Sequence, residues 1–342
     1  MSEKLTQNRS FKIALEITGT GGMEYPFYTS KILEFRNLEL LHAILTCATP
    51  IQYVAPWHYE KRTQEFISKI STVETTLSEC DGYLIKSPET EFLDPSEKSV
   101  TSYYLGLYFT KMFSMKEFAV DYFLNTTLFD QIYGSDSFIC NGRKKPSFVG
   151  YERKDNLFSI WEPTGKRDHA PKALDDAYNQ ALGIKSINSQ RPHYAMASMT
   201  YFDTKHSELQ GVLRNASEGR KAHIHFDKEH LYQLYYRPIC EIFDESLRRK
   251  PFDSVIDYID GYLEIELELF GLNVEDGADG TIRRKVKLGV PKDILGFFQY
   301  NTVNYDEGHR LSSIIDSLHI RPEEYQDDNF FMGRDGIYFR VL

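Results

Sequence analysis

The sequence predicts a mixed α/β (α+β) fold in which a central mixed sheet is flanked by helices. Three observations in the middle of the chain predict it: residues 135–162 contain short strand-like runs separated by polar turns, residues 171–183 carry apolar side chains at helical spacing, and residues 194–202 are again strand-like. The chain has 342 residues, 41% of them hydrophobic, which is enough for two or three folding units with a sizeable core.

The N-terminal segments mix strand and helix signals. Residues 11–18 alternate in a way that predicts a strand, which ends at a glycine-rich turn. Residues 34–47 have helical spacing, whereas residues 60–77 carry both patterns up to the Asp81-Gly82 turn, so helix and strand stay open there. Residues 88–99 contain two prolines and many acidic side chains without a period, which indicates a loop and a first domain boundary.

A central helix and the elements after it have stronger patterns. Residues 100–116 are apolar on nearly all sides, so we expect a buried helix with Ser99 as its N-cap. The elements that follow are three short strands, a helix ending at a glycine and a further strand, over residues 135–140, 147–153, 157–162, 171–183 and 194–202. Strands and helices therefore alternate as in an α/β core.

The C-terminal third begins with a strand over residues 222–226 and a long helix over residues 228–249, which Pro251 ends. Two alternating runs, at residues 262–273 and 282–290, predict strands, and the last residues predict a hairpin. The predicted organisation is an N-terminal α+β region (1–95), a central core (96–215) and a C-terminal α+β region (216–342).

The overall composition limits the function classes. With 40 Lys and Arg against 50 Asp and Glu, the net charge is −10, so contact with nucleic acid requires a local basic region. No apolar stretch approaches the roughly 20 residues of a membrane span, and no secretory signal begins the sequence. The four cysteines form no paired motif, which favours free thiols. We therefore expect a cytoplasmic protein without membrane association.

One window opposes the acidic balance. Between Gly142 and Arg167 there are seven basic and three acidic residues. A hairpin of the predicted strands would bring several of the basic side chains to one edge, where they could contact DNA phosphates; solvated turns are the alternative explanation. The candidate DNA-binding residues are Arg143, Lys144, Lys145, Arg153, Lys154, Lys166 and Arg167, with Gln180 on the following helix.

The same window resembles a known nuclease core. Pro146-Ser147 precedes a strand and a polar turn, and a second strand ends in Glu162-Pro163-Thr164-Gly165-Lys166 before the helix that carries Gln180. This pattern is similar to the restriction-endonuclease-like, or PD-(D/E)xK, superfamily, and the α-β-β-β-α-β order over residues 99–203 is similar too. The resemblance implies a restriction-endonuclease-like mixed sheet flanked by helices, with α+β additions at both ends.

Two departures from the family pattern are informative. The family places an Asp after the proline and an acid-x-Lys on the adjacent strand, because two carboxylates can hold Mg²⁺ while the lysine orients the attacking water. Ser147 stands at the Asp position and Thr164 at the lysine position, which leaves Glu162. The resemblance therefore implies a catalytically degenerate subunit that binds DNA and partners an active nuclease subunit in a hetero-oligomer, as in prokaryotic anti-phage defence.

Two other interpretations stay open. In the first, the chain is an active Mg²⁺-dependent endonuclease rearranged around Glu162, with Lys166 or Lys145 as the catalytic lysine and Asp155 or Glu97 as a second metal ligand. Mg²⁺ is required as a cofactor only in this case. In the second, the chain is a scaffold or sensor that does not bind DNA.

A separate set of residues could hold a different metal. His223, His225 and Asp227 alternate along a predicted strand, so they share one face and could bind Zn²⁺ or another transition metal. The alternative is a solvent-facing strand in which Asp227 serves as the N-cap of the next helix.

Overall fold

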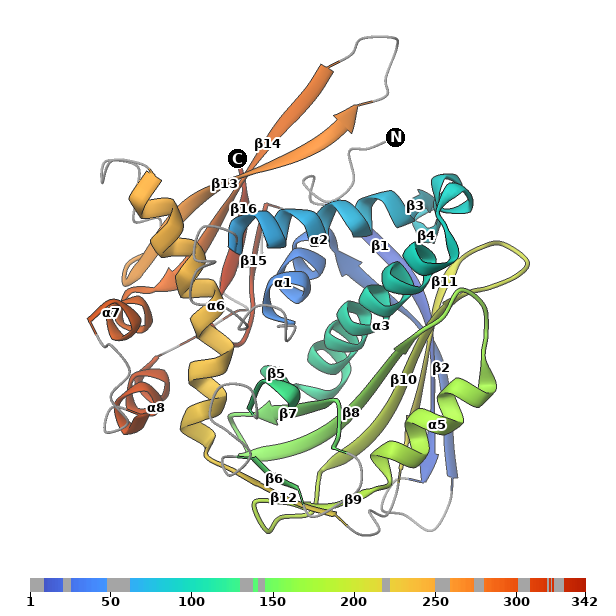
Figure 1. Ribbon diagram of the computed structural model, residues 1–342, viewed down its shortest axis with the longest axis horizontal. Coiled ribbons are helices and arrows are strands. Elements are labelled where there is room, and N and C mark those ends of the chain that lie inside the picture. Colours follow the sequence, from blue (N-terminus) through green and yellow to red (C-terminus); the bar gives the residue numbers. More distant parts are fainter. Residues whose placement is uncertain are drawn as a thin grey trace. The chain divides into compact units, whose positions relative to one another are not determined.

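The structure is a computed structural model that describes residues 9–20, 26–47, 62–129, 138–140, 145–216, 222–249, 259–273, 280–300, 308–318, 320, 322 and 329–342. The predicted mixed α/β (α+β) class is confirmed, since helices accompany a curled mixed sheet (Figure 1). The chain divides into two compact units. The nine-stranded unit comprises residues 10–36 and 72–226, and the four-stranded unit comprises residues 1–9, 37–71 and 227–342. No helix within the described residues is both long and apolar enough to cross a membrane.

The nine-stranded unit contains the candidate site. Its main sheet has the order β3-β4-β1-β11-β10-β8-β7-β5, with β2 paired to β1, and a second sheet has the order β6-β12-β9. Strands β8 and β10 are parallel, whereas β7 and β11 run antiparallel to β8 and β10 respectively. The elements are β1 (Ser10–Thr20), β2 (Pro26–Arg36), β3 (Leu77–Cys80), β4 (Tyr83–Lys86), η3 (Pro88–Phe92), α3 (Pro95–Phe118), β5 (Tyr122–Asn125), β6 (Phe138–Cys140), β7 (Phe148–Glu152), β8 (Leu157–Gly165), α5 (Pro171–Ala181), β9 (Ile184–Ile187), β10 (Tyr194–Phe202), β11 (Leu209–Asn215) and β12 (Ala222–Phe226).

Helices α3 and α5 cover opposite faces of the sheet. The hydroxyl of Thr110 on α3 donates to the hydroxyl of Ser198 at 2.6 Å, whereas Leu174 on α5 packs against Ala197 and Met199. Because successive residues of β10 point to opposite faces, these contacts place the two helices on different sides of the central strands (Figure 1). Side chains on the two faces of β8 therefore meet different helices.

The start of α3 differs from the prediction. The helix begins at Pro95 and its N-cap is Asp94, not Ser99. The carboxylate of Asp94 accepts hydrogen bonds from the backbone N–H groups of Ser96 and Glu97, and the Glu97 carboxylate accepts one from the backbone of Asp94. Proline is well suited to the first helical position, so the sequence Asp-Pro-Ser-Glu is a capping box rather than part of a loop.

The strand meander also differs from the prediction. Its first strand is β5, which follows α3 almost directly and pairs with β7. The described part of the predicted strand at residues 135–140 is β6, which pairs with β12 in the smaller sheet, and residues 135–137 lie outside the described residues. All four residues of β5 are buried, so its sequence has no alternation that would separate it from the end of an apolar helix.

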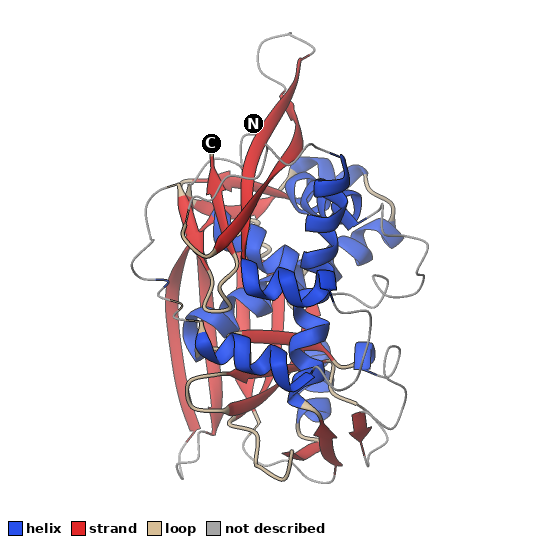
Figure 2. Cartoon of the chain, turned by 90° about the vertical axis from the view of Figure 1, so that its left-hand side faces the viewer, coloured by secondary structure: helices blue, strands red, loops and turns tan. Residues whose placement is uncertain are grey.

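The four-stranded unit contains a sheet of order β13-β14-β16-β15 and several helices. Strands β13 and β14 pair antiparallel along their whole length as a long ribbon, visible in Figures 1 and 2. Helix α2 (Arg62–Thr76) crosses from this unit into the other. The remaining elements are α1 (Asn37–Thr46), α6 (Lys228–Arg249), β13 (Tyr262–Asn273), β14 (Gly280–Pro291), α7 (Lys292–Tyr300), α8 (Gly308–Ser317), β15 (Phe330–Met332) and β16 (Tyr338–Val341).

Candidate functional site

Glu162 and Thr164 lie on the same face of β8, the face covered by α5. They are two residues apart in the strand, so their side chains point to the same side of the sheet. In the register of β8 and β10, Glu162 is opposite Ala197 and Thr164 is opposite Met199, and both of these β10 residues pack toward α5. The two positions of the acid-x-Lys pattern therefore face the helix that carries Gln180.

Ser147 binds both oxygens of the Glu162 carboxylate. Its backbone N–H donates to Oε1 at 2.8 Å, and its hydroxyl donates to Oε2 at 2.5 Å. Glu162 is only 3% exposed. Buried carboxylates require hydrogen-bond donors, and here a serine next to the strand start supplies two of them. Ser147, which the sequence resemblance aligns with a metal-binding Asp, thus acts as a donor to the glutamate.

The residues around Glu162 do not fit a Mg²⁺ site. Mg²⁺ is bound through oxygen ligands and seldom by a single protein carboxylate without phosphate, whereas both Glu162 oxygens accept hydrogens from Ser147. Asp155 lies in the turn at the far end of the hairpin, separated from Glu162 by the length of β8 from Leu157, roughly 16 Å at the usual rise per residue. Glu97 caps α3. Neither of the two predicted second ligands therefore completes a metal site with Glu162, because Asp155 is too far away and the Glu97 carboxylate caps a helix.

A glycine contact fixes the end of β8 against α3. A Cβ on Gly165 would lie 1.6 Å from the backbone oxygen of Ser102, and a Cβ on Gly106 would lie 2.5 Å from the backbone nitrogen of Gly165. Both positions consequently require glycine for the strand and the helix to approach this closely. Sequence reasoning identified Gly165 only as part of a turn; the small residue at Gly106, in the middle of a bulky apolar helix, was the available signal.

Lys145 is held beside the same end of the hairpin. The side-chain amide of Gln180 on α5 donates to the Lys145 backbone oxygen at 3.1 Å. Lys166 follows the end of β8; its backbone N–H donates to the Thr200 oxygen at 2.9 Å and its side chain is exposed. Because β7 and β8 are antiparallel, Lys145 before β7 and Lys166 after β8 lie toward the same end of the hairpin, but β8 continues four residues past Trp161, the partner of the first β7 residue Phe148. Lys145 therefore lies near the Ser147–Glu162 pair, and Lys166 lies beyond the pair at the end of β8.

The predicted basic strip is divided. Arg153 and Lys154 lie in the turn between β7 and β8, at the opposite end of the hairpin from Lys166, and the Arg153 backbone N–H donates to Asp121 at 2.7 Å. Arg167 makes a two-oxygen ion pair with Glu91, with both contacts at 3.1 Å. The five described basic residues of the window hence do not form one continuous strip, because they lie at opposite ends of the hairpin. Arg143 and Lys144 lie outside the described residues.

His223 and His225 lie on one face of β12, and this face is exposed, as in the alternative of a solvent-facing strand. His223 and His225 are both exposed on β12, and the residues between and around them are buried. Asp227 follows the strand, and its carboxylate accepts a hydrogen bond from the backbone N–H of Glu229 at 2.9 Å at the start of α6. The N-cap alternative thus describes the contact that the Asp227 carboxylate makes.

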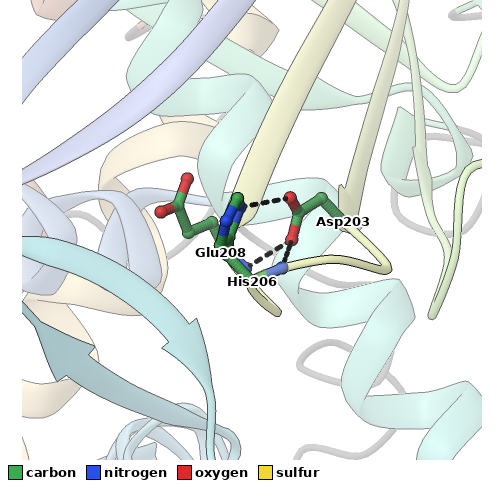
Figure 3. Close-up of side chains that lie close together, drawn as sticks. All are labelled: Asp203, His206 and Glu208. Atoms are coloured by element: carbon green, nitrogen blue, oxygen red, sulfur yellow. Dashed lines mark hydrogen bonds and ion pairs between the residues drawn. The ribbon is translucent and has the colours of Figure 1, made fainter.

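A different trio was not anticipated from the sequence. Among the described residues, Asp203, His206 and Glu208 are the one group of three metal-ligand side chains whose ligand atoms lie within 4.8 Å of one another. Asp203 accepts hydrogen bonds from the backbone N–H groups of the other two, and the Glu208 carboxylate points away from it (Figure 3). The Nδ1 atom of His206 lies 3.5 Å from Oδ2 of Asp203, and the His206 side chain is half exposed. The trio closes a turn between β10 and β11, and a short Asp-x-x-His-x-Glu spacing was its only sequence signal.

Comparisons with protein-family models, with curated proteins and with solved structures found no match for the chain.

Proposed function

We propose that this protein is a catalytically degenerate nuclease-fold subunit that binds DNA and works beside a separate, active nuclease subunit in a hetero-oligomer. The context is prokaryotic anti-phage defence, as the sequence resemblance implies. Two features of the nine-stranded unit support this proposal, namely the order of its elements and the chemistry at Glu162.

The element order supports a restriction-endonuclease-like core. Within the main sheet, helix α3 is followed by β5, β7 and β8, then by α5 and β10, and the four strands are neighbours in the order β5-β7-β8-β10. Strands β6 and β9, which lie between these elements in the sequence, belong to the smaller sheet. With those two strands set aside, the order is the α-β-β-β-α-β order that the sequence resemblance implies. The acid-x-Lys positions lie on β8, beside a strand whose start is marked by Pro146-Ser147.

The Ser147–Glu162 pair is the observation on which the loss of catalysis rests. A metal-dependent nuclease of this type needs a second carboxylate beside the glutamate and a lysine two residues after it. Here the first position donates two hydrogen bonds to Glu162, and the second carries the hydroxyl of Thr164. The buried glutamate is satisfied by protein groups, so it can be retained for the stability of the fold after catalysis is lost.

The DNA contact is assigned to the end of the hairpin that carries Lys145 and Lys166. Lys145 lies two residues before Ser147, and Lys166 follows the end of the strand that carries Glu162. In an active member of such a family the reacting phosphodiester lies at this site. Arg143 and Lys144 precede Lys145 in the sequence and add two positive charges to this segment of the chain. Binding through phosphates suits a chain whose net charge is −10, because the attraction is confined to one place.

The test compares two charge-reversal variants. Lys145→Glu/Lys166→Glu should lose most DNA binding in a fluorescence-anisotropy titration, and the slope of log K against log salt concentration should become shallower by about 2, because each phosphate contact contributes about 0.9. Lys154→Glu/Arg153→Glu makes the same charge change at the other end of the hairpin and should retain the wild-type slope.

Equal effects of the two variants would contradict the assignment of the contact to one end of the hairpin. Absence of DNA binding by the wild-type chain, with and without its co-encoded neighbour, would instead favour the scaffold or sensor interpretation. Far-UV circular dichroism of each variant checks that the fold is retained.

A further inference from the structure

The smaller sheet of the nine-stranded unit carries a groove that the proposed function does not use. It is an open hollow of about 730 Å³ beside β9 and β12. This volume lies within the usual range for sites that bind small molecules. Its polar lining consists of Lys185, Ser186, Ser189, Arg191, His223 and His225.

An irregularity in strand pairing shapes this groove. Strands β9 and β12 are parallel, and Ala222 is opposite Ile184 whereas His223 is opposite Ser186. Lys185 is therefore an extra residue on β9, as in a β-bulge, and its side chain is exposed while Ile184 and Ser186 are buried. Bulges of this kind redirect side chains and are frequent beside functional sites.

A hydrogen bond orients one of the two imidazoles. The Ser186 hydroxyl lies 2.6 Å from Nδ1 of His223, and Ser186 is 8% exposed. When the hydroxyl donates, the neutral imidazole carries its proton on Nε2, so this ring offers an N–H donor even without a charge. With the Ser186 hydroxyl as donor, the pair presents an Nε2–H group of His223 for a ligand in the groove.

A strained turn holds the edge of the groove. Asn188 and Ser189 have φ values of 47° and 67°, in the left-handed region that non-glycine residues seldom adopt. The turn is closed by two backbone hydrogen bonds between Ile187 and Gln190, at 2.7 and 2.8 Å. The Asn188 side chain also accepts a hydrogen bond from the Phe226 N–H at 3.0 Å. These contacts keep Ser189 at the groove in spite of its backbone conformation.

The positive charges and hydrogen-bond donors of the lining favour an anionic ligand. Lys185 and Arg191 are cationic, two hydroxyls and two imidazoles add donors, and no Asp or Glu is among the described residues that line the groove. A tetrahedral phosphate has several acceptor oxygens and suits a groove lined by such donors. We propose that this groove binds the phosphate group of a nucleotide, either free or as part of a nucleic-acid strand.

This inference is independent of the DNA contact proposed at Lys145 and Lys166, because it uses none of the same side chains. It also differs from the transition-metal interpretation of His223 and His225. A Zn²⁺ site would need a third protein ligand, whereas Asp227 caps α6 and the described neighbours in the groove are cations and hydroxyls.

The test uses the purified full chain and three probes, namely inorganic phosphate, AMP and a short oligonucleotide with or without a 5′-phosphate, titrated by isothermal calorimetry. Lys185→Glu/Arg191→Glu should weaken phosphate and AMP binding more than about tenfold, because each variant position removes a charged donor. Lys172→Glu, an exposed lysine on α5, is the control for a change of charge and should bind as the wild type does.

The outcomes separate the sources of the phosphate. Tighter binding of AMP than of either oligonucleotide identifies a free nucleotide, and a preference for the 5′-phosphorylated strand identifies a strand end. Phosphate and AMP binding that is absent, or that survives Lys185→Glu/Arg191→Glu, overturns the proposal, as does stoichiometric Zn²⁺ binding that His223→Gln abolishes. Lys145→Glu/Lys166→Glu should leave AMP binding intact, so failure of the proposed DNA contact is recognised separately.

Discussion

Asp335 is a buried carboxylate with several hydrogen-bond partners in the four-stranded unit. It is fully buried, and its carboxylate accepts hydrogen bonds from Tyr235 Oη at 2.5 Å and from the Ile337 backbone N–H at 3.1 Å, while His42 Nε2 lies 2.9 Å away. Its backbone oxygen accepts a further bond from Tyr236. One side chain in the final hairpin therefore connects α1, α6 and the turn between β15 and β16.

The substitution Asp335→Asn should destabilise the protein by about 3–5 kcal/mol, because it removes one partner of a buried polar network while the other donors stay in place. The exposed pair between Asp175 and Arg214 provides the control, and Asp175→Asn should change stability by at most about 1 kcal/mol. Urea unfolding followed by circular dichroism measures both. Similar losses for the two variants would contradict the structural role given to Asp335.

At the scale of single residues, the sequence pattern pointed to Ser147, Glu162 and Thr164 but not to the hydrogen bonds between Ser147 and Glu162. Ser147, Glu162 and Thr164 were identified from their places in a pattern. That Ser147 donates to both Glu162 oxygens depends on the pairing of β7 with β8, in which Phe148 lies opposite Trp161. A shift of one residue would turn the side chains to the other face, so such a bond follows from the register and not from composition.

At the scale of elements, the contact of β8 with α3 controls the position of the candidate site. The backbone of Gly165 packs directly against Ser102 and Gly106, on the face of β8 opposite to Glu162. Any side chain at Gly165 would push the strand away from the helix, and the displaced strand would carry Glu162 with it.

Gly165→Ala should therefore lower the free energy of unfolding by about 1–3 kcal/mol, because the added methyl group overpacks the contact between β8 and α3. Gly296→Ala is the matched control, because a Cβ there would meet nothing within 4 Å, and in helix α7 it should be neutral or stabilising by up to about 1 kcal/mol. Thermal unfolding by differential scanning calorimetry compares the two. A stable Gly165→Ala variant would show that the strand and helix do not need this close contact.

Elements with a long and regular hydrophobic pattern were predicted more accurately than elements without one. Helix α6 and strand β13 have the predicted bounds, because each has a long period that ends at clear breakers. In contrast, β2 continues into α1 between Arg36 and Asn37 without glycine or proline, so the predicted helix over residues 34–47 included the end of a strand. Local pattern does not reveal a strand that passes directly into a helix.

At the scale of the whole molecule, each compact unit is built from segments that are far apart in the sequence, whereas the sequence analysis divided the chain into contiguous regions. Residues 10–36 join residues 72–226, because β1 pairs with β11 from much later in the sequence, and residues 37–71 join the C-terminal segment. The three contiguous regions predicted from the sequence remain a prediction about folding units. Pairing between distant strands depends on tertiary contacts, which composition and loop signals do not encode.

The central claim concerns the whole molecule, namely that this chain has a nuclease fold without its own catalysis. The most direct measurement is a cleavage assay with Mg²⁺ on linear and circular DNA, using the chain alone and together with its co-encoded neighbour. Glu162→Gln keeps the size of the side chain and serves as the matched variant. We predict no cleavage by the chain alone, and cleavage with the neighbour that is the same for wild type and Glu162→Gln. Cleavage by the chain alone that Glu162→Gln abolishes would contradict the account and establish an active site around Glu162.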